Sequence, residues 1–197
     1  MIMFYKDYQK SRDLAWEVLL HEKVTRLPVK PGQLCKQMGI RVVYYDRGNP
    51  FDDDGTSLIV GGVPCIFIER GKPVRRQRFT CAHELGHILL GHVGEYELVN
   101  REPSRGDNPI EQAANVFAVR LLAPACVLRA LNARTPEQIA ELCDISLQAA
   151  TFRAERMKVL YHRNMFFKSS LEKQVYEQFQ DFVRERGGYR SSEASGI

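Results

Sequence analysis

The chain has 197 residues, of which 44% are hydrophobic and 26% are charged, so its composition is that of one globular domain with an appendage or of two small domains. The net charge of +4 is too small to indicate nucleic-acid binding by itself. The cysteines are odd in number and form no Cys-x-x-Cys pair, the N-terminus has no signal-peptide pattern, and no apolar run approaches the ~18 residues that span a membrane. We therefore expect a reduced, cytoplasmic protein outside the membrane.

The first third of the sequence predicts two helices followed by a small sheet. Gly61-Gly62 lies between two strand-like runs and indicates a two-residue hairpin, and Pro64 favours a strand end or an edge. Five basic residues between Arg70 and Arg78 indicate a solvated helix entrance rather than a docking patch. The predicted elements are helices over 7–22 and 32–38 and strands over 40–45, 58–60 and 63–68.

The next segment contains His-Glu-x-x-His, with His83, Glu84 and His87 at the fixed positions. On an α-helix the two histidines lie one turn apart on the same face, so both imidazoles can bind one zinc ion. Glu84 beside them can accept a proton from a metal-bound water, which is the nucleophile of a zinc hydrolase. The alternative is an amphipathic helix with two incidental histidines.

The sequence around this motif favours a helix that ends soon after it. Pro73 suits the first turn and Gly91 suits the C-terminal cap. Gly86 costs ~1 kcal/mol relative to Ala in mid-helix, which indicates close packing against a neighbour. His92 falls just beyond the predicted end, so we expect it behind a ligand or on the surface rather than on the metal.

A third ligand is available on the next predicted helix, which Asn108 opens and which runs to about Ala123. Glu111 and Asn115 share a face of this helix that is otherwise apolar, and a carboxylate there requires a partner. Two histidines, one glutamate and a water form the open tetrahedral site that catalysis needs. Asn115 can then hydrogen-bond a ligand imidazole. The alternative for Glu111 is a capping box with Asn108.

The combined pattern resembles the ImmA/IrrE family of bacterial metallopeptidases over about residues 10–165. The resemblance implies an α+β fold: a zincin-like metallopeptidase domain with a small sheet, a zinc-motif helix and a glutamate helix, then a helix-turn-helix-like part. It also implies a zinc endopeptidase that cleaves helix-turn-helix repressors, with His83, His87 and Glu111 as ligands and Glu84 as the base. Cys81 departs from the aliphatic residue common in the family, and we interpret it as a small buried hydrophobe rather than a redox-sensitive thiol. The residues that carry the resemblance are Phe79-Thr80-x-Ala82-His83-Glu84-Leu85-Gly86-His87 and Glu111-x-x-Ala114-Asn115-x-Phe117-Ala118-x-x-Leu121-Leu122-x-Pro124.

Residues 136–158 predict two helices joined by a tight turn, in the manner of a helix-turn-helix. In this interpretation Ile139 and Leu142 of the first helix face three apolar residues that follow, namely Ile145, Ala149 and Phe152. The side chains available to contact bases are Gln148, Thr151 and Arg153, with Arg156 and Lys158 beyond them. The segment is close to electrically neutral, whereas DNA readers need a basic excess, so we expect substrate docking or internal packing rather than DNA binding.

The sequence divides into a metallopeptidase domain over 1–130, a helical region over 131–186 and a polar tail over 187–197, with one last helix over 169–186. The expected function is a zinc-dependent endopeptidase that hydrolyses peptide bonds of a protein. An edge strand of the small sheet could hold the substrate extended by pairing with it. The oxyanion-stabilising residue is open among His92, Tyr96 and Arg120. The alternative functions are a non-cleaving regulator that binds a repressor or DNA around a structural zinc, and a zinc hydrolase of small amides.

Overall fold

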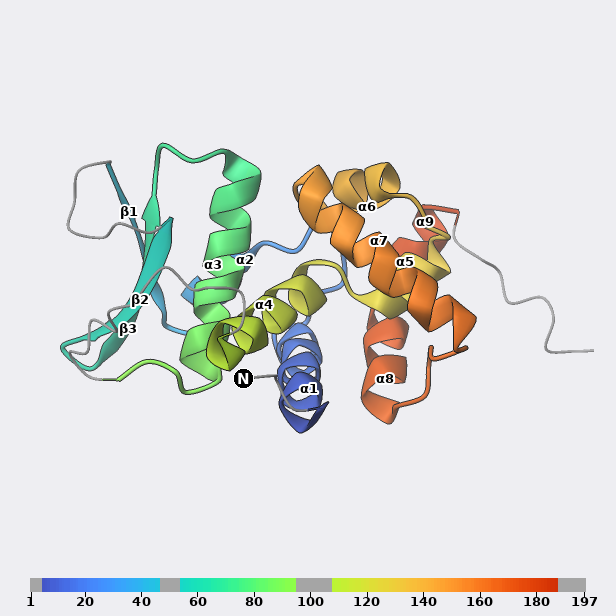
Figure 1. Cartoon of the computed structure of the whole chain (residues 1–197), viewed down its shortest axis with the longest axis horizontal. Helices are drawn as coiled ribbons and strands as arrows, with labels where there is room; N and C mark the ends of the chain where they lie inside the picture. The colour runs from blue at the N-terminus through green and yellow to red at the C-terminus, as the bar shows by residue number, and fades with distance from the viewer. Residues whose placement is uncertain (1–4, 47–53, 95–107, 188–197) are drawn as a thin grey trace, which may run out of the picture.

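The chain adopts a mixed α+β fold, which a computed structural model describes for residues 5–46, 54–94 and 108–187. The sheet lies at one end of the molecule, α6–α9 lie at the other, and α1 and α4 lie between them (Figure 1). The elements are α1 (Tyr5–His21), α2 (Pro31–Gln37), β1 (Arg41–Tyr45), β2 (Gly55–Val60), β3 (Val63–Glu69), α3 (Val74–Leu89), α4 (Pro109–Leu122), α5 (Ala125–Ala130), α6 (Pro136–Cys143), α7 (Leu147–His162), α8 (Ser170–Gln178) and α9 (Gln180–Glu185).

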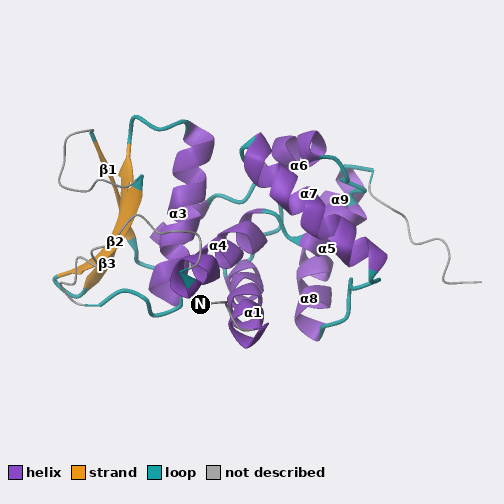
Figure 2. Ribbon diagram, viewed as in Figure 1, coloured by secondary structure: helices purple, strands orange, loops and turns teal. Residues whose placement is uncertain are grey.

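The sheet, orange in Figure 2, has the three strands that the sequence predicts. Their order is β1-β3-β2. β2 and β3 pair antiparallel across Gly61 and Gly62, whose φ angles of +58° and +78° suit the tight hairpin that twisted strands favour. β1 pairs parallel to β3 from Cys65 onward, so Pro64 lies at the beginning of the central strand, before that ladder starts. Within the described residues β2 pairs with β3 alone and forms an edge of the sheet.

The zinc-motif helix is confirmed as α3, and its C-terminus is closed by backbone hydrogen bonds. Gly91 adopts a φ of +76°, His92 N donates to His87 O at 2.9 Å, and Gly91 N donates to Ile88 O at 3.1 Å. These two bonds form a Schellman motif, which satisfies carbonyls that the helix end would leave unpaired. The motif fixes the chain direction directly after the second histidine.

One continuous hydrophobic core runs through both halves of the molecule. It extends from Ala15 in α1 through Leu121 in α4 to Val183 in α9. Because the predicted metallopeptidase domain and helical region share this core, the boundary at residue 130 stays a prediction. The predicted tail lies outside the described residues except for Gly187.

The predicted single helix over 169–186 is wrong, because two helices occupy this region. α8 ends at Gln178 and α9 begins at Gln180, with the fully buried Phe179 between them. Phe179 N donates to both Val175 O and Tyr176 O, at 3.2 and 3.1 Å, so the last turn of α8 tightens at this residue. No glycine or proline marks this break in the sequence.

The predicted face of α7 is also wrong for two residues. Phe152, expected between the two helices, is 69% exposed, whereas Arg153, expected on the surface, is 0% exposed. Arg153 Nε donates at 2.8 Å to the carbonyl oxygen of Ala123, at the C-terminus of α4. The last carbonyls of a helix lack partners within it, so this bond satisfies the carbonyl of Ala123, although burial and the nearby Arg120 lower the pKa of Arg153.

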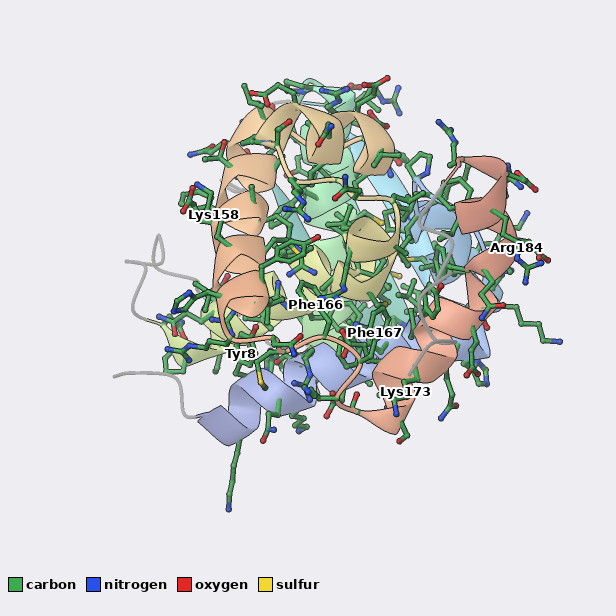
Figure 3. All side chains as sticks on the ribbon, turned by 90° about the vertical axis from the view of Figure 1, so that its right-hand side faces the viewer. Tyr8, Lys158, Phe166, Phe167, Lys173 and Arg184 are labelled. Carbon is green, nitrogen blue, oxygen red and sulfur yellow. The ribbon has the colours of Figure 1, made fainter. Side chains whose placement is uncertain are left out.

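Other side chains of α7 follow the predicted pattern only in part. Thr151 is exposed, but its hydroxyl donates to Leu147 O within the helix at 2.9 Å. Lys158 projects from the outer side of α7 and pairs with Glu155 at 2.7 Å (Figure 3). Of the basic residues proposed for DNA contact, Lys158 is therefore on the surface and Arg153 is not.

The basic residues that precede and open α3 are ion-paired rather than merely solvated. Arg76 lies 2.5 Å and Lys72 2.8 Å from carboxylate oxygens of Asp54. Arg75 and Arg78 both pair with Asp144, in the turn between α6 and α7. Partial burial raises the pKa of Asp144, but the two arginines outweigh this effect and hold that pKa below its usual value. The two ion pairs of Asp144 connect α3 to the segment α6–α7.

Helices α4 and α5 together form an apolar stretch over Pro109–Ala130. By length and composition its 22 residues could cross a membrane, but 78% of its most apolar window is buried inside the molecule. Such burial is typical of the core helix of a globular protein.

Candidate metal centre

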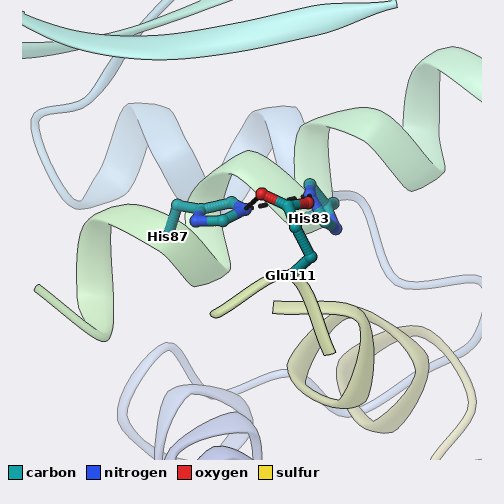
Figure 4. Close-up of side chains that lie close together, drawn as sticks. All are labelled: His83, His87 and Glu111. Atoms are coloured by element: carbon teal, nitrogen blue, oxygen red, sulfur yellow. Dashed lines mark hydrogen bonds and ion pairs between the residues drawn. The ribbon is translucent and has the colours of Figure 1, made fainter. Parts of the chain in front are cut away.

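Helices α3 and α4 pack against each other and bring the three predicted ligands together. His83 and His87 lie on one face of α3, and Glu111 reaches them from the first turn of α4 (Figure 4). Glu111 Oε2 lies 3.1 Å from His83 Nε2, and Glu111 Oε1 lies 3.4 Å from His87 Nε2. The two Nε2 atoms are 3.0 Å apart. Among the histidines, cysteines and acidic residues that the structure describes, these three have donor atoms close enough together to hold a metal ion.

These distances fit a tetrahedral zinc site. Zinc bonds to imidazole nitrogen and carboxylate oxygen are about 2.0–2.2 Å long, which places neighbouring ligand atoms of a tetrahedron roughly 3.3–3.6 Å apart. The two Nε2 atoms are 3.0 Å apart, and the nearest carboxylate oxygens, Oε2 to His83 and Oε1 to His87, lie 3.1 and 3.4 Å away, so the separations are close to those of such a site. Three protein ligands would leave the fourth position open, as in catalytic zinc sites.

The packing of α3 on α4 depends on Gly86, as the sequence predicts. A Cβ atom at this position would lie 2.9 Å from Cδ1 and 3.2 Å from Cγ of Phe117, whose side chain is fully buried. Real carbon atoms stay about 3.5–4.0 Å apart. The glycine therefore allows the helix of the histidines to approach the helix of Glu111.

Neighbouring side chains orient both imidazoles. Asn115 Oδ1 lies 3.0 Å from His83 Nδ1, one helical turn after Glu111. With a proton on His83 Nδ1 to donate to this amide oxygen, the lone pair of Nε2 would be available to a metal ion. His92 Nδ1 lies 3.2 Å from His87 Nδ1, behind the ring nitrogen that faces Glu111. His92 thus supports a predicted ligand, as expected, and is outside the group of donor atoms.

The Glu111 carboxylate is directed at the two histidines, which favours the ligand role over the capping box that was the alternative for this residue. Asn108 caps α4 through its Oδ1, which accepts from Ile110 N at 3.0 Å. Burial by itself raises the pKa of Glu111, but hydrogen bonds with His83 and His87 outweigh it and hold that pKa well below its usual range. The carboxylate is therefore ionised, the state that a metal ligand requires.

Glu84 is buried on the side of α3 that faces the sheet. Ser57 of β2 donates a hydrogen bond from Oγ to Glu84 Oε2 at 2.7 Å. This contact holds the carboxylate beneath the edge strand. Sequence reasoning missed Ser57, because the predicted strand began only at Leu58, whereas β2 begins at Gly55 and buries Gly55 and Ser57 on its inward face. A small polar residue on such a face requires a polar partner.

A comparison with protein families agrees with this site. Residues 35–155 match the family profile described as the IrrE N-terminal-like domain, a profile of peptidases. The match covers more than half of the chain. The chain belongs to the ImmA/IrrE family. A search of curated proteins finds no significant match.

The departure from the family pattern at Cys81 is accommodated in the core of this ImmA/IrrE member. Cys81 is buried, and its Sγ lies 3.8 Å from the Sγ of Cys35 in α2. The hydrogen bond with Cys35 and burial raise the pKa of the Cys81 thiol far above its usual value. A thiol in this environment stays neutral, as expected of a small buried hydrophobe.

The three residues considered as oxyanion stabilisers lie in different places. His92 contacts His87, as described above, and Tyr96 lies outside the described residues. Arg120 is buried against α1, where it donates a hydrogen bond to the hydroxyl of Tyr8 and its guanidinium lies 5.4 Å from the centre of the Tyr8 ring. The guanidinium of Arg120 thus contacts Tyr8 of α1, and Arg120 is not in the group of three predicted ligands.

Proposed function

We propose that this member of a peptidase family is a zinc-dependent endopeptidase that hydrolyses peptide bonds of a protein. The observation that carries the proposal is the convergence of His83, His87 and Glu111, with donor atoms all within 4.8 Å of one another, beside the buried Glu84. We infer that the small sheet, the zinc-motif helix and the glutamate helix form a zincin-like arrangement, and that the cell compartment is the cytoplasm.

When bound, zinc would supply a Lewis acid that polarises a carbonyl group and acidifies a water molecule. The chain's own residues then have distinct tasks. Glu84 would accept the proton of the attacking water and return it to the leaving amine. Ser57 holds one carboxylate oxygen of Glu84 in place. Asn115 fixes the tautomer of His83.

The position of β2 supports an extended polypeptide as substrate. β2 is an edge strand, and its Ser57 contacts Glu84 directly. A peptide that adds to this edge by backbone hydrogen bonds would pass beside the catalytic carboxylate. Small amides would gain nothing from such an edge, so this arrangement favours the endopeptidase over a small-amide hydrolase.

We further propose, on the family resemblance, that the substrate is a helix-turn-helix repressor. Co-expression with such a repressor encoded beside this chain, followed by gel electrophoresis and mass spectrometry, tests this point. A repressor that stays intact with active, zinc-loaded protein would contradict the substrate but not the chemistry.

The decisive variant for the chemistry is Glu84→Gln, which keeps the shape of the side chain and removes the base. We expect zinc content and thermal unfolding to stay near wild type, while cleavage of unfolded casein by the zinc-loaded protein falls by a factor of about 10²–10⁴. The matched control is Glu141→Gln, which changes an exposed carboxylate on α6. Cleavage at the wild-type rate by Glu84→Gln would instead favour a non-cleaving regulator with a structural zinc.

A further inference from the structure

A pocket with a volume of about 410 Å³ opens between α3, α4 and the beginning of α7. Phe79 lines it from α3, Asn115 and Val119 from α4, and Ala149 and Phe152 from α7. Three of the elements that form the core thus contribute to a concave surface. Pockets of this size that are lined mainly by apolar groups are typical of ligand sites.

The pocket adjoins the metal centre directly. Asn115 lines the pocket, and the same side chain lies 3.0 Å from Nδ1 of His83. The ring of Phe79 stacks on the His83 ring, with centroids 6.3 Å apart. One residue of an extended chain spans only about 3.3–3.6 Å. A substrate residue close to the bond at the metal centre can therefore place its side chain in the pocket.

The charged groups at the pocket are already neutralised. Arg75 and Arg76 line its rim, but Arg75 pairs with Asp144 at 2.9 Å and Arg76 with Asp54 at 2.5 Å. An acidic side chain would have to compete with these carboxylates. Ser146 and Gln148 add polar groups to the lining, but the larger surface comes from apolar side chains, Phe79, Val119, Ala149 and Phe152, and favours a large apolar group.

Phe152 is the apolar residue of the pocket with the largest exposure to solvent. It is 69% exposed, although it lies on a helix whose inward residues are fully buried. Large apolar side chains gain free energy when they leave water, and aromatic pairs gain more than their buried area alone implies. A substrate side chain in the pocket would cover Phe152.

We propose that this pocket is the subsite for a large apolar side chain of the substrate, next to the bond that is cut, and that Phe152 determines this specificity. The proposal rests on the proposed peptidase function, because the pocket is a substrate subsite only if the protein cleaves peptides. It gives the two-helix segment α6–α7 a role in substrate selection.

The first experiment measures binding without cleavage. N-acetyl-phenylalanine N-methylamide and its alanine counterpart are titrated into isotope-labelled protein, with and without zinc, and the amide signals of Asn115 and Ala149 are followed by NMR. We expect saturable shifts with the phenylalanine compound and binding of the alanine compound weaker by about tenfold or more. Phe152→Ala should weaken phenylalanine binding about fivefold. Equal binding of both compounds, or no effect of Phe152→Ala, would overturn the proposal.

The control variant is Val159→Ala. Val159 lies on the same helix, seven residues after Phe152, so the two positions are about 10 Å apart along the axis. It is partly exposed and does not line the pocket. Binding by this variant should equal that of wild type, and an equal loss in both variants would show a general effect on α7 and overturn the role of Phe152.

The second experiment measures cleavage of a proteome-derived peptide library by the zinc-loaded protein, with cut sites mapped by mass spectrometry. We expect large apolar residues to be enriched at one position beside the cut, and this enrichment to fall in Phe152→Ala but not in Val159→Ala. Cleavage without such a preference would overturn the subsite. Binding of the phenylalanine compound without any cleavage would keep the pocket and contradict the peptidase function, so the two failures are distinguishable.

Discussion

Gly86→Ala tests how closely the metal centre depends on the contact between α3 and α4. The new Cβ atom would lie 2.9, 3.2 and 3.3 Å from Cδ1, Cγ and Cβ of Phe117. Because Phe117 is fully buried, its ring has no open space into which to move. The helices must therefore separate by several tenths of an ångström.

Two effects of opposite sign decide the change in stability. Replacing glycine by alanine inside a helix contributes about 1 kcal/mol of stability. Overpacking of a buried contact costs about 1–3 kcal/mol. Since the closest contact is with a buried ring, we expect the overpacking to dominate, with a net loss of up to about 2 kcal/mol. For a chain of this length a loss of about 2 kcal/mol lowers the melting temperature by roughly 4–8 °C.

The same separation should weaken zinc binding. Metal sites tolerate ligand distances within only about 0.2 Å of ideal values. A shift of several tenths of an ångström between the histidine helix and Glu111 exceeds this tolerance. We expect a loss of roughly tenfold or more in zinc affinity, comparable to the loss of a supporting hydrogen bond.

The assays are urea unfolding and zinc competition with a chromogenic chelator. The matched control is Gly32→Ala in α2, where a Cβ atom would meet nothing within 4 Å and should stabilise the helix. In a Phe117→Leu background Gly86→Ala should cost less, because the ring is gone. If Gly86→Ala stabilises the protein as Gly32→Ala does and leaves zinc affinity unchanged, the packing argument is refuted.

Three further predictions concern the ligands, pH and DNA. Purified protein should bind about one zinc per chain, and Glu111→Gln should bind it at least about a hundredfold more weakly in competition assays; unchanged affinity would remove Glu111 from the ligands. Asp144→Asn keeps a residue type that tolerates the positive φ of 49° at this turn but loses the ion pairs, so urea unfolding at pH 7 should show a loss of up to about 1 kcal/mol. Since the folded pKa of Asp144 is lowered, its contribution is present above the unfolded pKa of about 3.9 and is lost as pH falls through the folded pKa, so the difference from wild type should shrink in acid; a difference that does not shrink between about pH 5 and pH 2 would contradict this. Duplex DNA should bind weakly and only at low salt; sequence-specific binding at physiological salt that is lost in Arg156→Ala/Lys158→Ala would contradict this expectation.

The sequence predicts the elements that local patterns determine. The hairpin at Gly61-Gly62 and the end of α3 at Gly91 follow from glycines whose positive φ angles suit those turns. The spacing of His83 and His87 is a local property of the helix. Their proximity to Glu111 could be inferred only because a carboxylate on an apolar helix face requires a partner.

The errors lie where distant parts of the chain meet. A helical pattern defines its inward face only to within about one residue, or 100° of rotation. In α7 the contact that decides this face is the bond from Arg153 to Ala123, and nothing near Arg153 in the sequence indicates it. The ion pairs of Asp144 with the beginning of α3 likewise join residues far apart in the chain.

These distant contacts also bear on the helix-turn-helix that the sequence predicts over residues 136–158. In DNA-binding proteins the first residues of the second helix contact base edges in the major groove. Here the corresponding residues, including Gln148 and Phe152, line the pocket beside the metal centre. The pairs of Asp144 with Arg75 and Arg78 hold this helix start against α3. Of the side chains predicted as available to bases, Gln148 therefore lines the pocket and Arg153 is buried, whereas Thr151 and Lys158 remain on the surface.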